Sequence, residues 1–349
     1  MRNTVRSRRS IIFGRRMATR WGIASAGKIS HDFATALATL PTGEHEIVGV
    51  AARDLSRAKV FAKLHNVSNA YGSYQDLAND RDVEVVYIGV LNPQHLEVAK
   101  LMLSNGKHVL CEKPLTLNVK QTRDLINFAN EKGLFLMEAI WSRCFPTYEW
   151  IKEEVNSGRL GEIKQVIATF GVPIADVERL RKNELGGGTI LDLGVYTIQF
   201  ASFIYNGDKP TSIKSSGHLN ENGIDTSMSA TLTYDGGRTA TILTHAVVSL
   251  PNEAFVIGTK GTLRVPQFWC PTKLVLPSGQ ERSLTLPEGA HRFNFCNSAG
   301  LRYEAAEVRR CLKAGLKESP FVTHEESLAI AMIEDELRRQ IGVVYSEDK

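Results

Sequence analysis

A lysine and two residues far downstream of it could together move a proton at an alcohol or carbonyl group. Lys113 lies in a Glu-Lys-Pro sequence, and Asp192 and Tyr196 lie four positions apart after a glycine run. Residues four apart in an α-helix share one face, so both could meet Lys113. Oxidising an alcohol needs a base, but a free tyrosine has a pKa of about 10. A nearby ammonium lowers a pKa by about one to three units, so we expect Lys113 to lower that of Tyr196. Asp192 would orient Lys113 or a hydroxyl of sugar or ribose.

The position of Lys113 favours a functional role. Residues 108–111 are typical of a buried strand, and Pro114 ends it because proline lacks the N–H that a sheet ladder needs. Lys113 is therefore expected at the C-terminal end of a strand, where open α/β sheets bind their ligands. The structural alternatives are a surface Glu-Lys-Pro turn, a core tyrosine at Tyr196 and a helix-start cap at Asp192.

The elements that would position these residues follow two patterns. Up to about residue 140, apolar runs at 21–24, 47–52, 83–90, 108–111 and 134–137 alternate with amphipathic segments. That alternation is typical of βαβ units and a doubly wound parallel sheet. After a helix at 148–155, runs at 163–170, 227–234 and 239–247 alternate residue by residue and predict a half-covered antiparallel sheet. The sequence thus predicts an extension at 1–16, an α/β domain at 17–140 and an α+β domain at 141–349.

The first expected strand leads into a turn that could hold a nucleotide. Residues 25–30 spell S-x-G-x-x-S where the dinucleotide-binding fingerprint has G-x-G-x-x-G. Gly27 stands where the backbone must approach a pyrophosphate, and the N–H groups of the helix start can hold that anion. We therefore expect cofactor contacts from Ser25, Gly27, Lys28 and Ile29, although two of the three glycines are absent.

The end of the second strand indicates which nucleotide is bound. An acid there would accept a bond from a ribose 2′-hydroxyl, whereas an arginine would bind a 2′-phosphate. Arg53 stands at the tip, and Arg57 follows about one helical turn later on the same side, which favours NADP over NAD. The alternative is that Arg53 is a solvated loop residue and Asp54 only caps the helix.

Composition limits the class of protein. The 349 residues, 43% hydrophobic and 23% charged, suffice for two domains. No apolar run approaches the roughly 20 residues that span a bilayer, so no membrane association is expected. Five scattered cysteines without a C-x-x-C pair argue against a disulfide framework and favour a reducing compartment such as the cytoplasm. Neither H-E-x-x-H nor G-x-S-x-G occurs, so neither a metal site nor a serine hydrolase is expected.

The basic charge is concentrated at the start of the chain. The net charge is +4, and residues 1–16 carry six arginines and no acid, so the remaining residues sum to −2. We interpret residues 1–16 as an extension ahead of Met17, with a mitochondrial presequence as the alternative. No basic patch with interleaved aromatic residues follows, so nucleic acid is not an expected partner.

Five motifs, in order, resemble those of the glucose–fructose oxidoreductase/inositol dehydrogenase (Gfo/Idh/MocA) family. They are Ser25-Ala26-Gly27, Leu91-Asn92-Pro93-Gln94-His95, Glu112-Lys113-Pro114, the segment 185–196 and the segment 258–263. The likeness covers about residues 17–344 and is greatest with NADP-dependent members that act on dihydrodiols and D-xylose. It implies a Rossmann domain followed by an α+β domain whose large, open, mostly antiparallel sheet forms a homodimer interface.

The resemblance also implies roles for individual residues. It makes Tyr196 the acid/base, with Lys113 and Asp192 beside it. It implies cofactor contacts from Leu91, Asn92, His95, Glu112 and Lys113. His95 follows the apolar run at 83–90, where it could bond cofactor or substrate, and the alternative is a helix-start histidine without a ligand.

Substrate contacts are expected from aromatic residues. Trp141 and Arg143 follow the last strand of the parallel sheet and can therefore reach a substrate. By resemblance, Trp141, Phe170 and Phe295 line the pocket with Tyr196, where aromatic rings suit a cyclohexadiene ring or the hydrophobic face of a sugar. The alternative for each aromatic residue is plain core packing.

The expected function is NADP-dependent hydride transfer between nicotinamide and a CH–OH group of a trans-dihydrodiol or a cyclic aldose such as D-xylose. One alternative is a catalytically inactive NADP-binding regulatory protein on the same fold. Another is a family oxidoreductase with a different polyol or sugar substrate. Lys113 together with Tyr196 speaks against the inactive protein, because binding alone needs neither.

Overall fold

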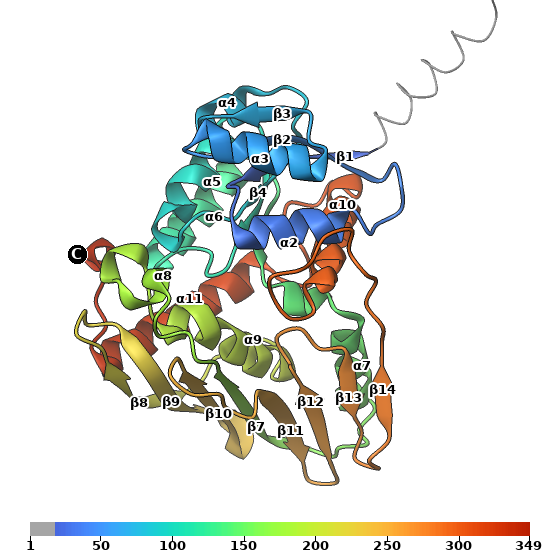
Figure 1. Ribbon diagram of the computed structural model, residues 1–349. Coiled ribbons are helices and arrows are strands. Elements are labelled where there is room, and N and C mark those ends of the chain that lie inside the picture. The colour runs from blue at the N-terminus through green and yellow to red at the C-terminus, as the bar shows by residue number, and fades with distance from the viewer. Residues whose placement is uncertain (1–17) are drawn as a thin grey trace, which may run out of the picture.

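A computed structural model describes residues 18–349 (Figure 1), so the extension expected at 1–16 lies outside the described residues. The first sheet has six parallel strands in the order β3-β2-β1-β4-β5-β6. They are β1 (Thr19–Ala24), β2 (His45–Ala51), β3 (Asn69–Tyr71), β4 (Val85–Ile88), β5 (His108–Glu112) and β6 (Leu136–Ala139). The helices between them are α2 (Lys28–Leu37), α3 (Leu55–His65), α4 (Tyr74–Asn79), α5 (His95–Ser104) and α6 (Val119–Lys132). The predicted doubly wound parallel sheet is confirmed.

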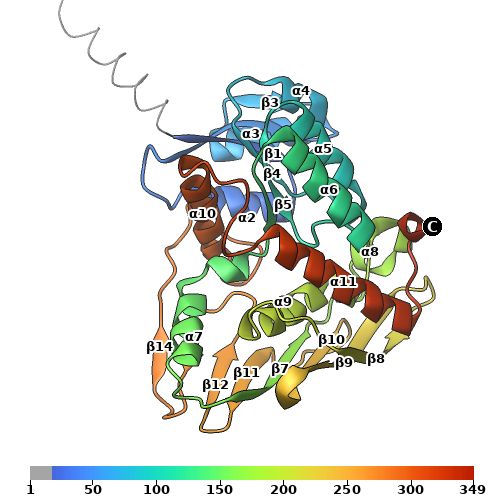
Figure 2. The ribbon, with the colours of Figure 1, turned by 180° about the vertical axis from the view of Figure 1, so that it is seen from behind.

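Helices cover both faces of this sheet. Helices α2 and α3 lie on one side, and α5 and α6 lie on the other (Figures 1 and 2). All four residues of β4 are buried, which is why an apolar run forms this central strand. Asp54 caps α3 as predicted, because its side chain accepts a hydrogen bond from the Ser56 N–H at 2.8 Å.

The second sheet has eight strands in the order β14-β13-β12-β11-β7-β10-β9-β8. They are β7 (Ile163–Gly171), β8 (Ser212–Leu219), β9 (Asp225–Tyr234), β10 (Arg238–His245), β11 (Glu253–Gly258), β12 (Thr262–Pro266), β13 (Lys273–Val275) and β14 (Glu281–Ser283). Only β7 and β10 pair in parallel among the strands of this sheet in residues 18–349. Buried and exposed residues alternate along most of β9. The predicted open, mostly antiparallel sheet is confirmed.

The helices of the C-terminal half lie on one side of this sheet, and some of them contact helices of the first sheet. They are α7 (Pro146–Asn156), α8 (Glu178–Arg181), α9 (Val195–Ile204), α10 (Leu301–Lys313) and α11 (His324–Ile341). Helix α10 contacts α2, and α11 contacts both α6 and α9 (Figure 2). The largest buried apolar cluster accordingly extends from Phe33 beside the first sheet to Phe268 beside the second. None of the helices in residues 18–349 has the length and apolar character needed to cross a membrane.

Some strands have no clear pattern in the sequence. Strand β8 is mostly exposed, so it shows no apolar alternation, and β3, β13 and β14 have three residues each. Such segments form because neighbouring strands offer hydrogen-bonding edges, which a local pattern does not reveal.

A segment between β14 and α10 crosses from the second sheet to the first. We call residues 286–297 the strap. Asp32 of α2 is buried and accepts hydrogen bonds from the backbone N–H groups of Asn294 at 2.9 Å and Phe295 at 3.0 Å. His31 of α2 lies 3.1 Å from the carbonyl oxygen of Arg292. The strap therefore lies along α2, as the orange loop in Figure 1 shows.

Candidate active site

Lys113 lies directly after β5, at the C-terminal edge of the parallel sheet. Its ammonium donates hydrogen bonds to the carbonyl oxygen of Asp192 at 2.8 Å and to Asp192 Oδ1 at 3.1 Å. The Lys113 Nζ atom also lies 5.0 Å from the centre of the Tyr196 ring. The structure thus brings together the three residues on which the predicted chemistry depends.

Asp192 and Tyr196 approach Lys113 through an unusual helical turn. Residues Ile190–Gly194 form a π-helical turn that continues into α9. Asp192 therefore does not lie in the α-helix that its spacing of four from Tyr196 predicted. Single π turns are rare and are frequent at functional sites.

Asp225 of β9 fixes the start of this turn. Its Oδ2 accepts hydrogen bonds from Thr189 N at 2.7 Å, Thr189 Oγ1 at 2.6 Å and Ile190 N at 2.9 Å. Gly188 just before the turn has a φ of +110°, and a Cβ atom there would lie 2.3 Å from Asp225 Oδ1. Glycine is required at this position for both reasons.

Asp192 is a carboxylate shared by two cations. Besides Lys113, Arg179 of α8 donates to Asp192 Oδ1 at 2.9 Å and to Oδ2 at 3.3 Å. Burial alone would raise the pKa of Asp192, but the charges of Lys113 and Arg179 outweigh burial and hold that pKa well below its ordinary value. Asp192 is therefore ionised and orients Lys113. Arg179 could not be identified from the sequence, because one arginine in a charged segment carries no sign of where that segment folds.

Tyr196 is held by a second predicted residue. Its hydroxyl oxygen accepts a hydrogen bond from Trp141 Nε1 at 2.9 Å. An indole N–H only donates, so the phenol proton is free to reach another acceptor. The ring centre of Phe170 lies 5.8 Å from that of Tyr196. The Phe170 ring also stacks on Trp269, with 4.0 Å between the two ring centres. Trp269 extends this aromatic wall and was not found from the sequence.

The pKa of Tyr196 shifts in the direction opposite to the one expected. Burial and the negative charge of Glu112 raise the pKa well above its ordinary value, and the hydrogen bond from Trp141 opposes this only in part. The prediction of a lowered pKa is wrong for this state. The positive charge of Lys113 is paired with the Asp192 carboxylate. It therefore does not offset the rise in the pKa of Tyr196 that burial of the phenol causes. Tyr196 is consequently a protonated phenol at neutral pH.

Two buried acids lie near Tyr196. Glu112 accepts hydrogen bonds from the Tyr87 hydroxyl and from the backbone N–H of Lys113 at 3.3 Å. Glu304 of α10 is fully buried, and neither of its carboxyl oxygens has a hydrogen-bond partner in residues 18–349. Burial raises the pKa of both acids. Glu112 was expected to contact a cofactor, but its carboxyl group is engaged with Tyr87.

The first turn leaves space at Gly27. This residue precedes α2 and has a φ of −95°, which any residue can adopt. Among residues beyond its chain neighbours, a Cβ atom at Gly27 would meet nothing closer than Ser25 Oγ at 3.7 Å. Neither backbone strain nor packing within the described chain demands glycine here. The space and the free N–H groups at Lys28 and Ile29 therefore fit a pyrophosphate at the start of α2.

Arg53 and Arg57 gather beside that turn, and both are exposed. Arg57 Nη2 donates to the carbonyl oxygen of Ala26 at 3.4 Å. Burial raises the pKa of Tyr74, which is hydrogen-bonded to Ser25, and the charges of Arg53 and Arg57 partly oppose that rise. Two cations thus lie near the first turn, as a 2′-phosphate would require.

Two residues after β4 have side chains that are hydrogen-bonded to backbone carbonyl groups. Asn92 Nδ2 donates to the carbonyl oxygen of Gly186 at 3.0 Å. The ring nitrogens of His95 lie 2.8 Å from the carbonyl oxygen of Pro114 and 3.2 Å from that of Val90. The alternative of a histidine without a ligand therefore fits His95 better than a direct cofactor contact. Leu91, which was also predicted to contact the cofactor, is half-buried.

Two predicted substrate contacts are not brought to Tyr196. Arg143 forms an ion pair with Glu326, and its Nε donates to the carbonyl oxygen of Phe321 at 3.2 Å. These contacts engage Arg143 with α11 and the segment before it, and its role as a substrate contact stays a prediction. Phe295 lies on the strap with 46% of its surface exposed.

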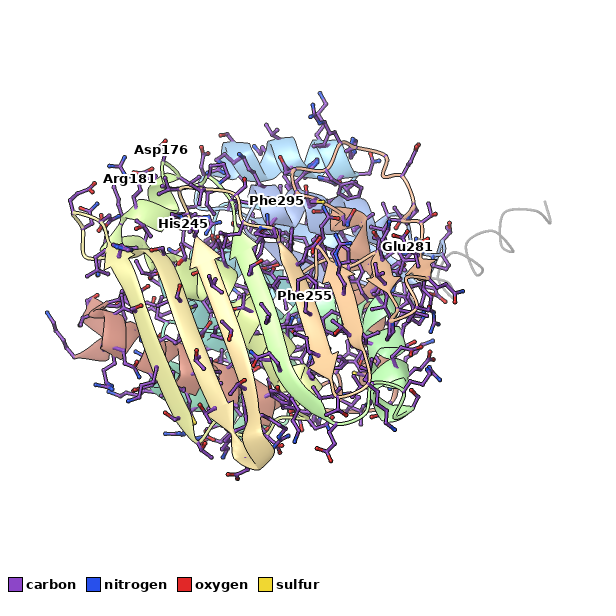
Figure 3. The ribbon with its side chains drawn as sticks, turned by 90° about the horizontal axis from the view of Figure 1, so that it is seen from below. Asp176, Arg181, His245, Phe255, Glu281 and Phe295 are labelled. Carbon is purple, nitrogen blue, oxygen red and sulfur yellow. The ribbon has the colours of Figure 1, made fainter. Side chains whose placement is uncertain are left out.

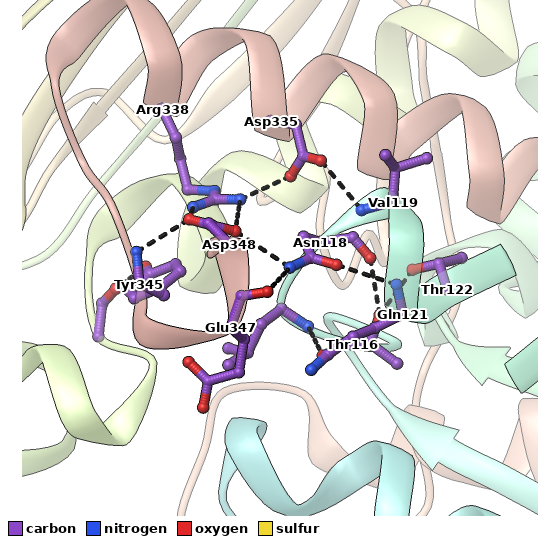
Figure 4. Close-up of polar contacts among 12 residues, drawn as sticks. Thr116, Asn118, Val119, Gln121, Thr122, Asp335, Arg338, Tyr345, Glu347 and Asp348 are labelled. Atoms are coloured by element: carbon purple, nitrogen blue, oxygen red, sulfur yellow. Dashed lines mark hydrogen bonds and ion pairs between the residues drawn. The ribbon is translucent and has the colours of Figure 1, made fainter. Parts of the chain in front are cut away.

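The C-terminal segment secures the chain that follows Lys113 (Figure 4). Asn118 caps α6 and donates from Nδ2 to the carbonyl oxygen of Glu347 and to Asp348 Oδ1, both at 3.0 Å. Arg338 of α11 pairs with Asp348 at 2.7 Å. Two distant parts of the chain thereby hold the loop between β5 and α6.

Two family profiles match the chain. Residues 19–140 match the oxidoreductase family with an NAD-binding Rossmann fold, and residues 148–264 match the GFO/IDH/MocA C-terminal domain. Together the profiles cover most of the chain, and each falls on one of the two sheets described above.

Curated relatives match nearly the full length of the chain. Trans-1,2-dihydrobenzene-1,2-diol dehydrogenase of Danio rerio is 47% identical over 333 residues, which are 95% of this chain and 99% of the relative. The enzyme of that name from Sus scrofa is 47% identical over 335 residues, which are 95% of this chain and 100% of the relative.

Solved structures share the fold. The 3-ketoreductase KijD10 from Actinomadura kijaniata, in complex with NADP and TDP-benzene, has a TM-score of 0.78 at 25% identity over 93% of this chain and 98% of its own. Aldose–aldose oxidoreductase from Caulobacter crescentus has a TM-score of 0.79 at 19% identity over 93% of this chain and 97% of its own. With two matching profiles and relatives near half identity, the chain belongs to the Gfo/Idh/MocA family of oxidoreductases.

Proposed function

We propose that this oxidoreductase is an NADP-dependent dehydrogenase that acts on CH–OH groups of trans-dihydrodiols or of cyclic aldoses such as D-xylose. The observation that carries the proposal is the meeting of Lys113, from the parallel sheet, with Asp192 and Tyr196, from the second half of the chain. A cation, its orienting carboxylate and a phenol with a free proton are the groups that proton transfer at an alcohol carbon requires.

Support for this substrate class comes from the relatives and from the aromatic wall. The curated relatives described above are named for a dihydrodiol. Trp141, Phe170 and Trp269 surround Tyr196 with flat apolar surfaces, which suit a ring-shaped substrate that carries hydroxyl groups. Phe295 would add to this wall if the strap brings its ring inward.

The residues that would hold NADP lie along the C-terminal edge of the parallel sheet. Ser25, Gly27, Lys28 and Ile29 would bind the pyrophosphate, and Arg53 with Arg57 would bind the 2′-phosphate. Leu91, Asn92 and Lys113 follow neighbouring strands of the same edge. When bound there, NADP supplies the nicotinamide that accepts or gives the hydride.

Tyr196 would carry the proton in this mechanism. As a protonated phenol it can donate from Oη to the oxygen of a carbonyl substrate, while Trp141 holds that Oη in place. In alcohol oxidation the same oxygen must accept the proton, which needs positive charge near the phenol. Lys113, 5.0 Å from the ring, is the cation that would supply it, and Asp192 keeps Lys113 oriented.

The proposal is tested with the purified full-length protein. NADP⁺ with a trans-dihydrodiol or with D-xylose should give rising absorbance at 340 nm, and NAD⁺ should give a lower kcat/KM. A panel of other polyols and sugars ranks the substrates. NADP binding without turnover of any member of the panel would favour the inactive regulatory protein and refute the proposal.

We also propose that the protein forms a homodimer through the second sheet. The face of this sheet opposite α7 and α9 is covered by none of the helices in residues 18–349 (Figure 3). Ile167, Leu243, Phe255 and Ile257 are half-buried on neighbouring strands of this face. An apolar patch flanked by threonine and serine side chains is typical of a surface that a second subunit covers.

A further inference from the structure

Two cysteines from separate segments lie side by side. Cys270 follows β12, and Cys296 lies on the strap. Gln267 Nε2 donates a hydrogen bond to the Cys296 sulfur at 3.4 Å, and Cys270 is the neighbour with the largest effect on the pKa of the Cys296 thiol. Asn297 donates from Nδ2 to the carbonyl oxygen of Cys270 at 2.9 Å, which joins the two backbones as well. Several contacts therefore hold together the two segments that carry Cys270 and Cys296.

Accessibility separates the two thiols. Cys296 is exposed and Cys270 is buried. The other cysteines of the chain are less accessible than Cys296, since Cys111 and Cys311 are buried and Cys144 is half-buried. A reagent in solution therefore reaches Cys296 before Cys270.

The environment also makes Cys296 the more acidic thiol. The hydrogen bond from Cys270 favours the thiolate and lowers the pKa of Cys296 to about 6, although partial burial opposes it. Burial raises the pKa of Cys270 well above its ordinary value, so Cys270 keeps its proton and acts as the donor. An accessible thiolate with a second thiol beside it is the arrangement found at redox-sensing cysteines.

We propose that Cys296 and Cys270 form a redox-sensitive dithiol, in which hydroperoxide oxidises Cys296 and Cys270 then closes an intramolecular disulfide. This inference does not depend on the proposed dehydrogenase activity, because its evidence is thiol geometry.

The chemistry balances with hydrogen peroxide as the oxidant. The Cys296 thiolate attacks one peroxide oxygen, so an S–O bond forms, the O–O bond breaks and the departing hydroxide takes a proton to become water. The sulfur loses two electrons and the peroxide gains them. The Cys270 sulfur then attacks Cys296 Sγ, so the S–S bond forms and the S–O bond breaks. The second water leaves with the proton of Cys270.

The disulfide would join the strap to the aromatic wall. Cys270 directly follows Trp269, whose ring stacks on Phe170 at 4.0 Å, and Cys296 directly follows Phe295 on the strap. A bond between the two sulfurs would therefore fix the strap against the segment that supports the wall. Oxidation would change the mobility of Phe295, the aromatic residue of the strap that is 46% exposed.

The first test measures thiol reactivity on the reduced full-length protein. The rate of Cys296 alkylation by iodoacetamide, followed by peptide mass spectrometry, should rise through a midpoint near pH 6. Gln267→Ala removes one donor to the sulfur and should move the midpoint upward. A midpoint at pH 8 or above in the wild type would overturn the proposal.

The second test maps the oxidation product. Treatment with hydrogen peroxide should lower the five free thiols of the chain to three and link the peptides that contain Cys270 and Cys296. Dithiothreitol should reverse the link. In Cys270→Ser, a dimedone adduct should accumulate on Cys296, while Cys144→Ser should still form the disulfide. Five remaining thiols, or a disulfide that involves another cysteine first, would contradict the inference. None of these measurements needs a substrate or NADP.

Discussion

At the scale of single residues, the charge of Asp192 organises the site. Its carboxylate holds Lys113 and Arg179, and its side chain is 10% exposed. Breaking a fully buried ion pair costs about 3–5 kcal/mol, because the remaining charge stays unpaired. Arg179 is 39% exposed, so solvent compensates part of its loss.

Asp192→Asn should therefore lower the free energy of unfolding by about 2 kcal/mol at pH 7. The pKa of Asp192 is lower in the folded chain than the value of about 3.9 in an unfolded one. Its stabilisation is thus complete above about pH 4 and is lost as the pH falls further. Urea denaturation from pH 7 to pH 3 should show the difference between variant and wild type narrowing below pH 4. Glu221→Gln, at an exposed ion pair with Arg181, is the control and should change stability little at any pH.

The arginines beside the first turn set the expected cofactor preference. Arg53→Asp places a negative charge where a 2′-phosphate would bind, so KM for NADP should rise about tenfold or more while KM for NAD changes little. Steady-state assays with both nucleotides measure the ratio. Lys59→Asp makes the same charge change at an exposed position elsewhere on α3 and should leave the ratio of the two KM values unaltered. Equal effects of Arg53→Asp on both nucleotides would rule out the phosphate role.

The sequence predicted the contact of Lys113 with Asp192 and Tyr196 but not its electrostatics. A strand end and a spacing of four are local signals, and both led to the correct partners. The pKa of Tyr196 depends on burial and on Glu112 and Glu304, which come from other elements of the fold. The ion pair of Arg143 could not be predicted for a similar reason, because its partner Glu326 lies in α11, far along the chain.

At the scale of elements, the turn before α9 determines where Asp192 lies. Asp225 accepts the N–H groups at the start of Ile190–Gly194, and Gly188 provides the backbone bend that brings them there. Buried Asp225 has a pKa raised to about 6, because burial outweighs its hydrogen bonds. The π turn thus rests on one carboxyl group and one glycine.

Gly188→Ala should destabilise the protein by at least about 3 kcal/mol, because strain at φ +110° adds to a Cβ atom 2.3 Å from Asp225 Oδ1. Gly207→Ala is the matched control. Its φ is +78° and a Cβ atom there meets nothing within 4 Å, so only the backbone cost of about 1–2 kcal/mol is expected. Chemical denaturation of both variants checks this. Equal losses would mean that the contact with Asp225 is not limiting.

Elements with a strong hydrophobic period were predicted well. Elements whose position depends on contacts with distant parts of the chain were not. Central strands such as β4 and β5 are apolar runs, and Asp54 marks the start of α3. The π turn has no sequence period of its own, since it depends on Asp225 reaching it from β9. The strap likewise owes its course to the contact of Asn294 with Asp32.

At the scale of the whole molecule, the second sheet presents one covered and one open face (Figure 3). Stable subunit interfaces bury about 1,200–2,000 Å² in total, and a broad sheet face can supply such an area. The C-terminal helices already fix the two sheets to each other, because α10 contacts α2 and α11 contacts α6. Within residues 18–349, the open face is therefore available for the proposed contact with a second copy.

Phe255→Glu should convert the proposed dimer to a monomer, because a carboxylate on the patch would be buried without a partner. Size-exclusion chromatography with light scattering measures the mass. Val60→Glu, on α3 and 70% exposed, is the control and should leave the mass unchanged. A wild-type chain that is monomeric at micromolar concentration would contradict the proposed dimer.

The two-sheet architecture was predictable because its halves have different hydrophobic periods. The edge strand β8 pairs regularly with β9, but it is mostly exposed and therefore has no hydrophobic period from which it could be predicted. The course of the strap along α2 could not be predicted either, because it joins residues about 260 apart in the sequence.

The turnover of Lys113→Met tests whether the ammonium beside Tyr196 is needed for catalysis. Removing the ammonium leaves Asp192 paired with Arg179 alone and takes away the cation that lies 5.0 Å from the Tyr196 ring, so kcat for NADP-linked oxidation should fall at least about a hundredfold. Circular dichroism should confirm the fold, and Lys100→Met on α5 should retain wild-type kcat. Turnover by Lys113→Met within about threefold of wild type would show that catalysis does not depend on this ammonium.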